Sequence, residues 1–201
     1  KGRGRFGREW SSGSGGLYMT IVLREKDLDK AKYLTFIAAV SVAKVICKIA
    51  DLDAKVKWPN DVLIGHKKIC GILTETISGN GNYALVGIGL NVNQKKFPKS
   101  IMRNSTSLKI ESNKNYGIKK LSNLIIEEFN NLYSRYDKRN YGKIIEAWKE
   151  YSHTLGKLIK AKTLTGTYTG KAVDVDEECN LILRLNDGTM KKIMEGDIFI
   201  I

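Results

Sequence analysis

Hydrophobic and polar positions divide the first half of the chain into strand-like and helix-like segments. Apolar residues recur at helical spacing from Ala31 to Ala50 and predict a buried helix. Segment 17–23 (LYMTIVL) is rich in β-forming residues and predicts a strand after the Gly/Ser run SSGSGG. Further short apolar runs predict strands at 55–58, 62–64, 69–77 and 83–92, of which the second and third form a hairpin and the last is central.

The pattern changes after residue 93. A polar segment at 94–115 predicts a long irregular loop, and 118–136 and 141–153 predict two amphipathic helices. From Gly156 onward, short apolar runs predict a small β-barrel, with turns at Thr165-Gly166, Glu177-Glu178 and Asn186-Asp187-Gly188. The chain is therefore expected to be an α+β protein with two domains, residues 1–155 and 156–201.

Charge suggests anionic partners without specifying them. The 201 residues include 34 Lys and Arg against 21 Asp and Glu, a formal net charge of +13. Nucleic acid, a nucleotide or an acidic protein would all suit this excess. Most of the excess is Lys scattered along the chain, which is more typical of a solvated surface.

The cysteines and the longest apolar run bear on location. Cys47, Cys70 and Cys179 lie far apart without metal-ligand spacing, which favours buried free thiols in a reducing compartment. Lys44 and Lys48 interrupt the apolar run from Tyr33 to Ala50, so we expect no stretch that is long and apolar enough to span a membrane. We also expect no signal peptide, because the opening residues lack the apolar run of one. The expectation is a soluble, cytoplasmic protein.

The opening segment KGRGRFGREW could hold an oxyanion. Alternating glycines allow backbone N–H groups to converge, and arginine forks bind carboxylate or phosphate. Arg-Gly repeats also occur in disordered RNA-binding arms, which would be the better interpretation of this segment in isolation.

Three more segments carry candidate chemistry. In KWPNDVLI (57–64), Pro59 ends a strand and leaves Asn60 and Asp61 to bind a ribose hydroxyl or a magnesium ion on a triphosphate. In KKICGILTE (67–75), Lys68 could neutralise a carboxylate and a phosphate together. Strict alternation would place Lys68 on the face of Cys70 and Ile72.

The fourth segment is GIGLNVN (87–93). Two glycines at a spacing of two inside a core strand suggest that something packs against the backbone there. Asn91 and Asn93, expected on the same face as Gly87 and Gly89, could contact a nucleobase or phosphate.

These four segments, in this order and spacing, resemble biotin protein ligase, also called biotin–[acetyl-CoA-carboxylase] ligase or holocarboxylase synthetase. The resemblance covers nearly the whole chain. It implies a class II synthetase-like, mixed or antiparallel sheet with helices on one side, and a C-terminal barrel of the Src-homology-3 type. It also implies an enzyme that joins biotin and ATP, with Mg²⁺, into biotinyl-5′-adenylate and then transfers biotin to a lysine of a biotin carboxyl carrier domain.

The resemblance also implies roles for individual residues. Lys68, Arg5 and Asp61 would be catalytic, with Asp61 a possible Mg²⁺ ligand. ATP or the adenylate would contact Arg3, Arg8, Trp10, Asn60 and Asn91. Biotin would contact Gly2, Arg3, Lys68, Gly71, Gly87 and Gly89.

Other implications and alternatives stay open. In the family, further biotin contacts come from a strand and helix before the GRGR loop, so we expect part of the biotin site, and any DNA-binding domain, to lie before Lys1. A homodimer through a sheet edge is expected by analogy, and DNA binding by the chain itself is not expected. The alternatives are a lipoate or octanoyl ligase or transferase of the same fold, a basic nucleic-acid-binding module, and a lysine-rich globular domain without such a site.

Overall fold

The structure is a computed structural model and describes residues 2–201. Its main sheet has five antiparallel strands in the order β3-β7-β6-β5-β4. They are β3 (Leu17–Arg24), β4 (Ala54–Lys57), β5 (Asp61–Ile64), β6 (Lys67–Ile77) and β7 (Tyr83–Leu90). All five expected strands are confirmed, with ends that shift by one or two residues.

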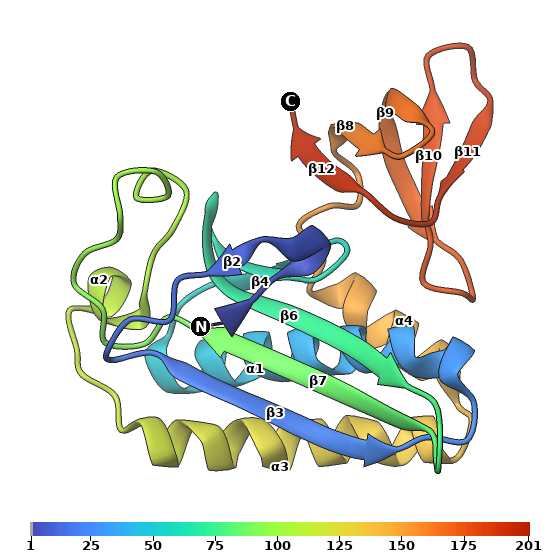
Figure 1. Ribbon diagram of the computed structural model, residues 1–201. Coiled ribbons are helices and arrows are strands. Elements are labelled where there is room, and N and C mark those ends of the chain that lie inside the picture. Colours follow the sequence, from blue (N-terminus) through green and yellow to red (C-terminus); the bar gives the residue numbers. More distant parts are fainter. Residues whose placement is uncertain (1) are drawn as a thin grey trace.

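The helices cover one face of this sheet, as Figure 1 shows. They are α1 (Lys32–Ala50), α2 (Leu108–Ser112), α3 (Ile118–Asp137) and α4 (Tyr141–Glu150), and a 3₁₀ turn, η2 (Leu28–Ala31), leads into α1. The core consists of the inward side chains of the sheet and of α1, where Leu34, Ile37 and Ile46 are fully buried. The opposite face of the sheet is left for the site.

Helix α1 corrects one expectation. By length and composition alone, Leu28–Ala50 is apolar enough to cross a membrane, so the prediction that no segment reaches that standard was wrong. Helix α1 contacts both the sheet and α3, so it needs apolar residues around most of its surface. Its mean hydropathy therefore stays high in spite of Lys44 and Lys48. The same test is passed by the buried core helix of a globular fold, and 67% of this window is buried.

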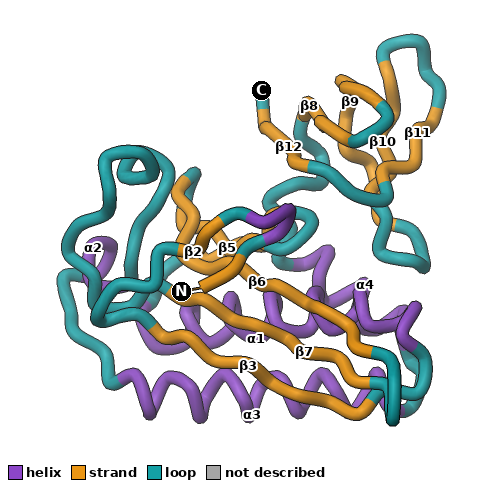
Figure 2. The backbone as a smooth tube through the Cα atoms, viewed as in Figure 1, coloured by secondary structure: helices purple, strands orange, loops and turns teal. Residues whose placement is uncertain are grey.

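The long polar segment after β7 is more ordered than expected. It contains α2, which begins at Ser107, whose hydroxyl accepts a hydrogen bond from the N–H of Ile110. The helix ends at Asn113, a residue with a left-handed backbone (φ 57°). Figure 2 shows the loop between β7 and α2 projecting beside the sheet. Five residues are too few for a clear helical period, which explains why the sequence pattern missed α2.

The C-terminal residues form a second antiparallel sheet in the order β11-β10-β9-β8-β12. Its strands are β8 (Leu158–Thr163), β9 (Gly166–Val175), β10 (Leu181–Leu185), β11 (Met190–Ile193) and β12 (Asp197–Ile200). The turns fall where Thr165-Gly166 and Asn186-Asp187-Gly188 predicted them. The two sheets lie on either side of the expected boundary at residue 155, and the division into two domains there stays a prediction.

Three hydrogen bonds, two of them buried, join the main sheet and α1 to the C-terminal part of the chain. The indole Nε1 of Trp58, which follows β4, donates to the carbonyl of Cys179 at 3.0 Å, and the Trp58 N–H donates to Thr154 Oγ1 at 3.0 Å. The hydroxyl of Tyr33 on α1 donates to the carbonyl of Glu177. These contacts fix the C-terminal sheet against the main one, so β12 has a defined place at the rim of the open face.

Candidate functional site

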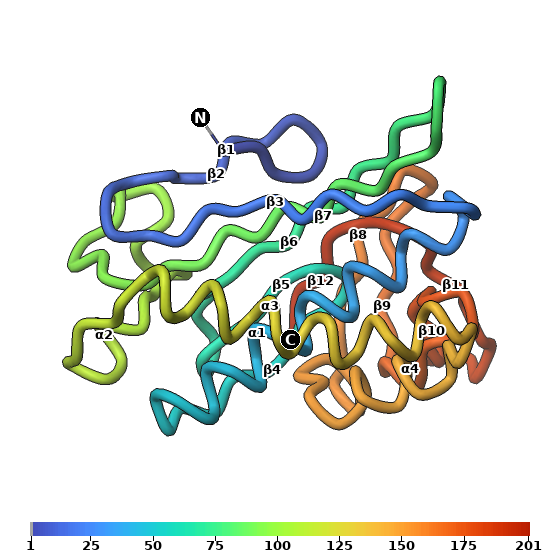
Figure 3. The backbone as a smooth tube through the Cα atoms, turned by 90° about the horizontal axis from the view of Figure 1, so that it is seen from below, coloured from blue at the N-terminus to red at the C-terminus, as the bar shows by residue number. Residues whose placement is uncertain are grey.

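A cavity of about 460 Å³ lies on the helix-free face of the main sheet. Its walls are the opening segment, the exposed sides of β6 and β7, and the start of β12. Figure 3 shows the opening segment on one side of the sheet and the helices on the other. Most of the expected site residues line this cavity, namely Gly2, Arg3, Arg5, Arg8, Trp10, Asn60, Asp61, Lys68, Gly71, Gly87 and Gly89.

The opening segment is folded rather than an extended arm. Strands β1 (Gly2–Arg3) and β2 (Glu9–Trp10) pair in antiparallel register around η1, a 3₁₀ turn at Arg5–Gly7. The N–H of Gly4 donates to the carbonyl of Arg8 at 2.7 Å and closes the turn. Phe6 and Gly7 have positive φ angles (55° and 71°), the left-handed conformation that a tight reversal requires. The segment therefore holds its arginines at the cavity.

Trp10 lies on a glycine floor. Gly71 and Gly89 face each other across β6 and β7. A Cβ atom on Gly89 would lie 2.6 Å from the Trp10 Nε1, and one on Gly71 would lie 2.9 Å from the Trp10 ring. Only glycine permits this approach. The indole Nε1 is buried and has no hydrogen-bond partner among residues 2–201, so it is an available donor for a ligand.

Gly87, the third glycine of these two strands, does not contact Trp10. A Cβ there would meet the backbone carbonyl of Leu73 at 3.3 Å and nothing of Trp10 within 4 Å. The expectation that Trp10 contacts ATP or the adenylate stays a prediction. What the structure shows is an indole resting on Gly71 and Gly89, two of the four glycines that the resemblance assigns to biotin.

A β-bulge sets the direction of Lys68. Across β5 and β6, Val62 faces Cys70 but Leu63 faces Lys68, so Ile69 is an extra residue without a partner. The bulge reverses the alternation, and Lys68 Nζ would lie 3.2 Å from a Cβ on Gly71. The expectation that Lys68 shares a face with Cys70 and Ile72 was therefore wrong, because strict alternation fails at a bulge.

The ammonium of Lys68 lies between the carboxylate of Asp61 and the indole of Trp10. Its Nζ is 2.5 Å from Asp61 Oδ1 and 5.3 Å from the centre of the Trp10 ring. Asp61 begins β5 and faces Gly71 across the ladder, so the same floor positions both charges. Asn60 is fixed beside them, since its Nδ2 donates to the carbonyl of Ile72 at 2.7 Å.

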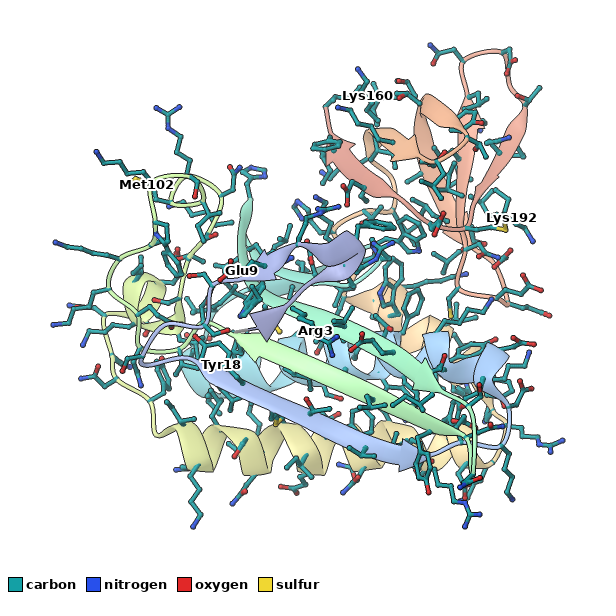
Figure 4. The ribbon with its side chains drawn as sticks, in the orientation of Figure 1. Arg3, Glu9, Tyr18, Met102, Lys160 and Lys192 are labelled. Carbon is teal, nitrogen blue, oxygen red and sulfur yellow. The ribbon has the colours of Figure 1, made fainter. Side chains whose placement is uncertain are left out.

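Each arginine of the opening segment contacts an acceptor that an anionic ligand could replace. Arg3 pairs with Glu75 at 3.3 Å, and Arg8 pairs with Asp197 at 2.6 Å. Arg5 donates to Asn60 Oδ1 at 3.4 Å and to the carbonyl of Gly196 at 3.3 Å. Burial lowers the pKa of Arg5, although Asp197 and Asp61 oppose the change. Figure 4 shows Arg3 and Glu9 over the open face of the sheet.

Sequence reasoning missed Glu75 and Asp197. Glu75 follows Gly71 by four residues on β6 and lines the cavity, so strand alternation could have found it. Asp197 gave no local signal, because it reaches the cavity only through the docking of a strand that lies 189 residues after Arg8.

Asn91 and Asn93 are the residues that the structure does not bring to the cavity. Both follow the last residue of β7, so the alternation that placed them beside Gly87 and Gly89 no longer applies. Asn91 is buried, and its Nδ2 donates to the carbonyl of Thr106 at 2.9 Å. The amide of Asn93 is used by the backbone of Tyr116. Among residues 2–201 neither lines the cavity.

Comparisons with known proteins identify relatives of this chain. Residues 1–93 match the model of the biotin/lipoate A/B protein ligase family, and residues 154–200 match the biotin protein ligase C-terminal domain. The chain is 37% identical to the bifunctional ligase/repressor BirA of Bacillus subtilis (strain 168) over 98% of its own length. It spans only 62% of that relative.

Two further comparisons cover more of the compared protein. The structure matches that of biotin protein ligase from Aquifex aeolicus in complex with biotin and ATP, with a TM-score of 0.90 and 28% identity over 99% of this chain and 84% of that one. The biotin–[acetyl-CoA-carboxylase] ligase of Paracoccus denitrificans is 32% identical over 91% of this chain and 80% of its own length. The chain therefore belongs to the biotin protein ligase family.

Proposed function

We propose that this protein activates biotin with ATP to biotinyl-5′-adenylate and transfers biotin to a lysine of a biotin carboxyl carrier domain. The observation that carries the proposal is the meeting of Lys68, three arginines and a glycine floor in one cavity. The related proteins support it, since they include a biotin–[acetyl-CoA-carboxylase] ligase and a biotin protein ligase in complex with biotin and ATP.

The first step brings two anions together. A biotin carboxylate oxygen attacks the α-phosphorus of ATP, the bond between that phosphorus and the bridging oxygen breaks, and pyrophosphate leaves. Cations fixed between the carboxylate and the phosphates reduce their repulsion and stabilise the transition state. Lys68 would lie between them, with Arg3 and Arg5 on the carboxylate and α-phosphate and Arg8 on the remaining phosphates. No nucleophilic side chain is needed.

In the second step, the uncharged amine of the acceptor lysine attacks the carbonyl carbon of the adenylate. The carbon–oxygen bond to the phosphate breaks, AMP leaves, and the amine loses a proton. Asp61 is the carboxylate we propose as a helper in this proton transfer. Its Oδ1 already holds the ammonium of Lys68, so the two groups would act as a pair.

Magnesium would enter with the triphosphate. Among residues 2–201 no cluster of three or more His, Cys, Asp or Glu could hold a metal ion by itself. Mg²⁺ on a nucleotide commonly uses one or two carboxylates together with phosphates and water, and the carboxylate of Asp61 suits that role. Bound there, the ion would neutralise phosphate charge.

Further parts of the proposal concern the surroundings of the site. We propose that the C-terminal sheet is a small barrel of the Src-homology-3 type, supported by its five antiparallel strands, and that the main sheet is class II synthetase-like.

The free edge of β3, with an exposed Val22, supports a homodimer that pairs two sheets. The three free cysteines support a cytoplasmic location.

The test is incubation with Mg-ATP, a carrier domain and either biotin or lipoate, followed by measurement of the carrier mass. We expect one biotin per carrier domain and no lipoate. Turnover of lipoate alone would overturn the choice of substrate, and absence of both products would overturn the activity. A duplex oligonucleotide that binds tightly, even after the Lys68→Ala substitution, would favour a nucleic-acid-binding module instead.

A further inference from the structure

The backbone of Lys68 is held by a loop far along the chain. Its N–H donates to the carbonyl of Asn104 at 2.8 Å, and its carbonyl accepts from the N–H of Thr106 at 3.0 Å. Ser105 thereby forms a parallel bridge with Lys68. This contact lies at the bulge, where the pairing of β6 with β5 is irregular. The loop base at 104–106 therefore supplies backbone hydrogen bonds at the point where the ladder is weakest.

Thr106 is fixed in turn by polar side chains, of which Asn91 is buried and Glu111 is partly buried. It has no exposed surface, and its hydroxyl donates to Glu111 Oε1 on α2 at 2.5 Å. Its carbonyl accepts from Asn91 Nδ2 at 2.9 Å. Asn91 is only 4% exposed, and its Oδ1 accepts from Gln94 at 3.4 Å. Buried polar groups that satisfy one another hold a single arrangement.

We infer that Thr106, fixed by Asn91 and Glu111, is a positioning residue that acts through the backbone of Lys68. The inference rests on the proposed function of Lys68. The hydroxyl of Thr106 touches no part of the cavity among residues 2–201, so its effect on catalysis must pass through Lys68. It also gives Asn91 a use that its burial allows, support of the loop base.

The reason is geometric. The Lys68 side chain must cross above Gly71 to meet Asp61, and its direction depends on the backbone at the bulge. Without the Thr106–Glu111 hydrogen bond, the loop base can move and the bulge can relax. A small displacement of a charge in an active site can cost about tenfold or more in rate.

Thr106→Val and Thr106→Ser test the inference, because valine keeps the shape and loses the hydroxyl, whereas serine keeps the hydroxyl. We expect Thr106→Val to lower kcat for pyrophosphate release about tenfold, with a smaller change in the KM for biotin, and Thr106→Ser to stay within about twofold of the unchanged protein. In a Lys68→Ala background, Thr106→Val should add less than about a twofold loss, because the group through which it acts is absent.

A second measurement does not need activity. The Lys68 amide should exchange its hydrogen faster in Thr106→Val than in Thr106→Ser, while the amide of Val86 in the central ladder keeps its rate. Additive losses of Thr106→Val and Lys68→Ala, or equal Lys68 amide exchange in the two Thr106 variants, would overturn the inference. If the unchanged protein forms no adenylate, the proposed function fails, and the exchange measurement still decides whether Thr106 holds the Lys68 backbone.

Discussion

Arg8 and Asp197 form an ion pair of 2.6 Å between the opening segment and the first residue of β12. Beside it, Arg5 donates to the carbonyl of Gly196. The C-terminal sheet thus contributes directly to the wall of the cavity. We infer that its docking and the position of the opening arginines are coupled.

Replacing Asp197 with asparagine should loosen the opening segment. Both side chains of the pair are partly exposed, so its loss should cost no more than about 1 kcal/mol, equivalent to about a fivefold change. We expect trypsin to cut after Arg5 and Arg8 up to about fivefold faster in the variant without ligands, and cleavage in both proteins to slow when biotin and ATP bind.

The matched control is Asp53→Asn, which removes an exposed ion pair with Lys55 away from the cavity. Cleavage at the opening arginines should be unchanged there. Equal rates in Asp197→Asn and Asp53→Asn would show that β12 does not restrain the segment.

Lys68 and Lys67 provide a second matched pair. Lys68→Ala should lower adenylate formation about 10²- to 10³-fold, because it removes a fixed cation from the meeting point of carboxylate and phosphate. Lys67 is exposed at the start of β6, and Lys67→Ala should change the rate less than about twofold. Pyrophosphate release in single turnover is the measurement, and similar losses in both variants would contradict the assigned role of Lys68.

The sequence predicted the strands and the long helices from local patterns, and the four segments that it singled out contain most of the residues that line the cavity. A run of β-forming residues marked β3, an apolar run marked β7, and the two glycines within β7 marked a close approach to the sheet. In each case the signal and its structural consequence lie within a few residues.

The residues that the sequence-based predictions misplaced or missed depend on contacts between distant parts of the chain. The direction of Lys68 depends on a bulge that is defined by pairing between two strands, and alternation within β6 carries no trace of it. Asn91 was misplaced because its partner, Thr106, lies on a loop whose return to β6 is a tertiary contact. Asp197 enters the cavity through the packing of two sheets.

The glycine floor can be tested with Gly89→Ala. The added Cβ would overlap the Trp10 indole at 2.6 Å, so the ring must lift from the sheet. We expect weaker biotin binding by about tenfold or more, since overpacking of this kind costs about 1–3 kcal/mol, together with a shift in tryptophan fluorescence. Gly79→Ala is the control, because a Cβ there meets nothing within 4 Å. Unchanged fluorescence and affinity in Gly89→Ala would mean that Trp10 does not rest on the floor.

His66 and His153 give a prediction about pH. Their rings meet edge to face, 5.9 Å apart, where the turn between β5 and β6 approaches the segment that leads into the C-terminal sheet. Burial lowers the pKa of His153, and His66, Lys157 and Lys57 lower it further, while Asp53 acts in the opposite direction. The folded protein therefore binds a proton at His153 less readily than the unfolded chain, whose histidine pKa is about 6.5.

The sign of the effect follows from this difference. As pH falls through the unfolded pKa, the unfolded chain takes up the proton first, so the free energy of unfolding decreases until the pH passes below the folded pKa. His153→Asn should lose less stability than the unchanged protein between pH 7.5 and 5.5 (about one unit on either side of the unfolded pKa). His66→Asn should also reduce the loss of stability between these pH values, but by less than His153→Asn. It removes only one of several groups that disfavour the charged ring of His153. Urea unfolding at both pH values measures these differences, and an identical loss of stability in all three proteins would exclude His153 as a source of acid sensitivity.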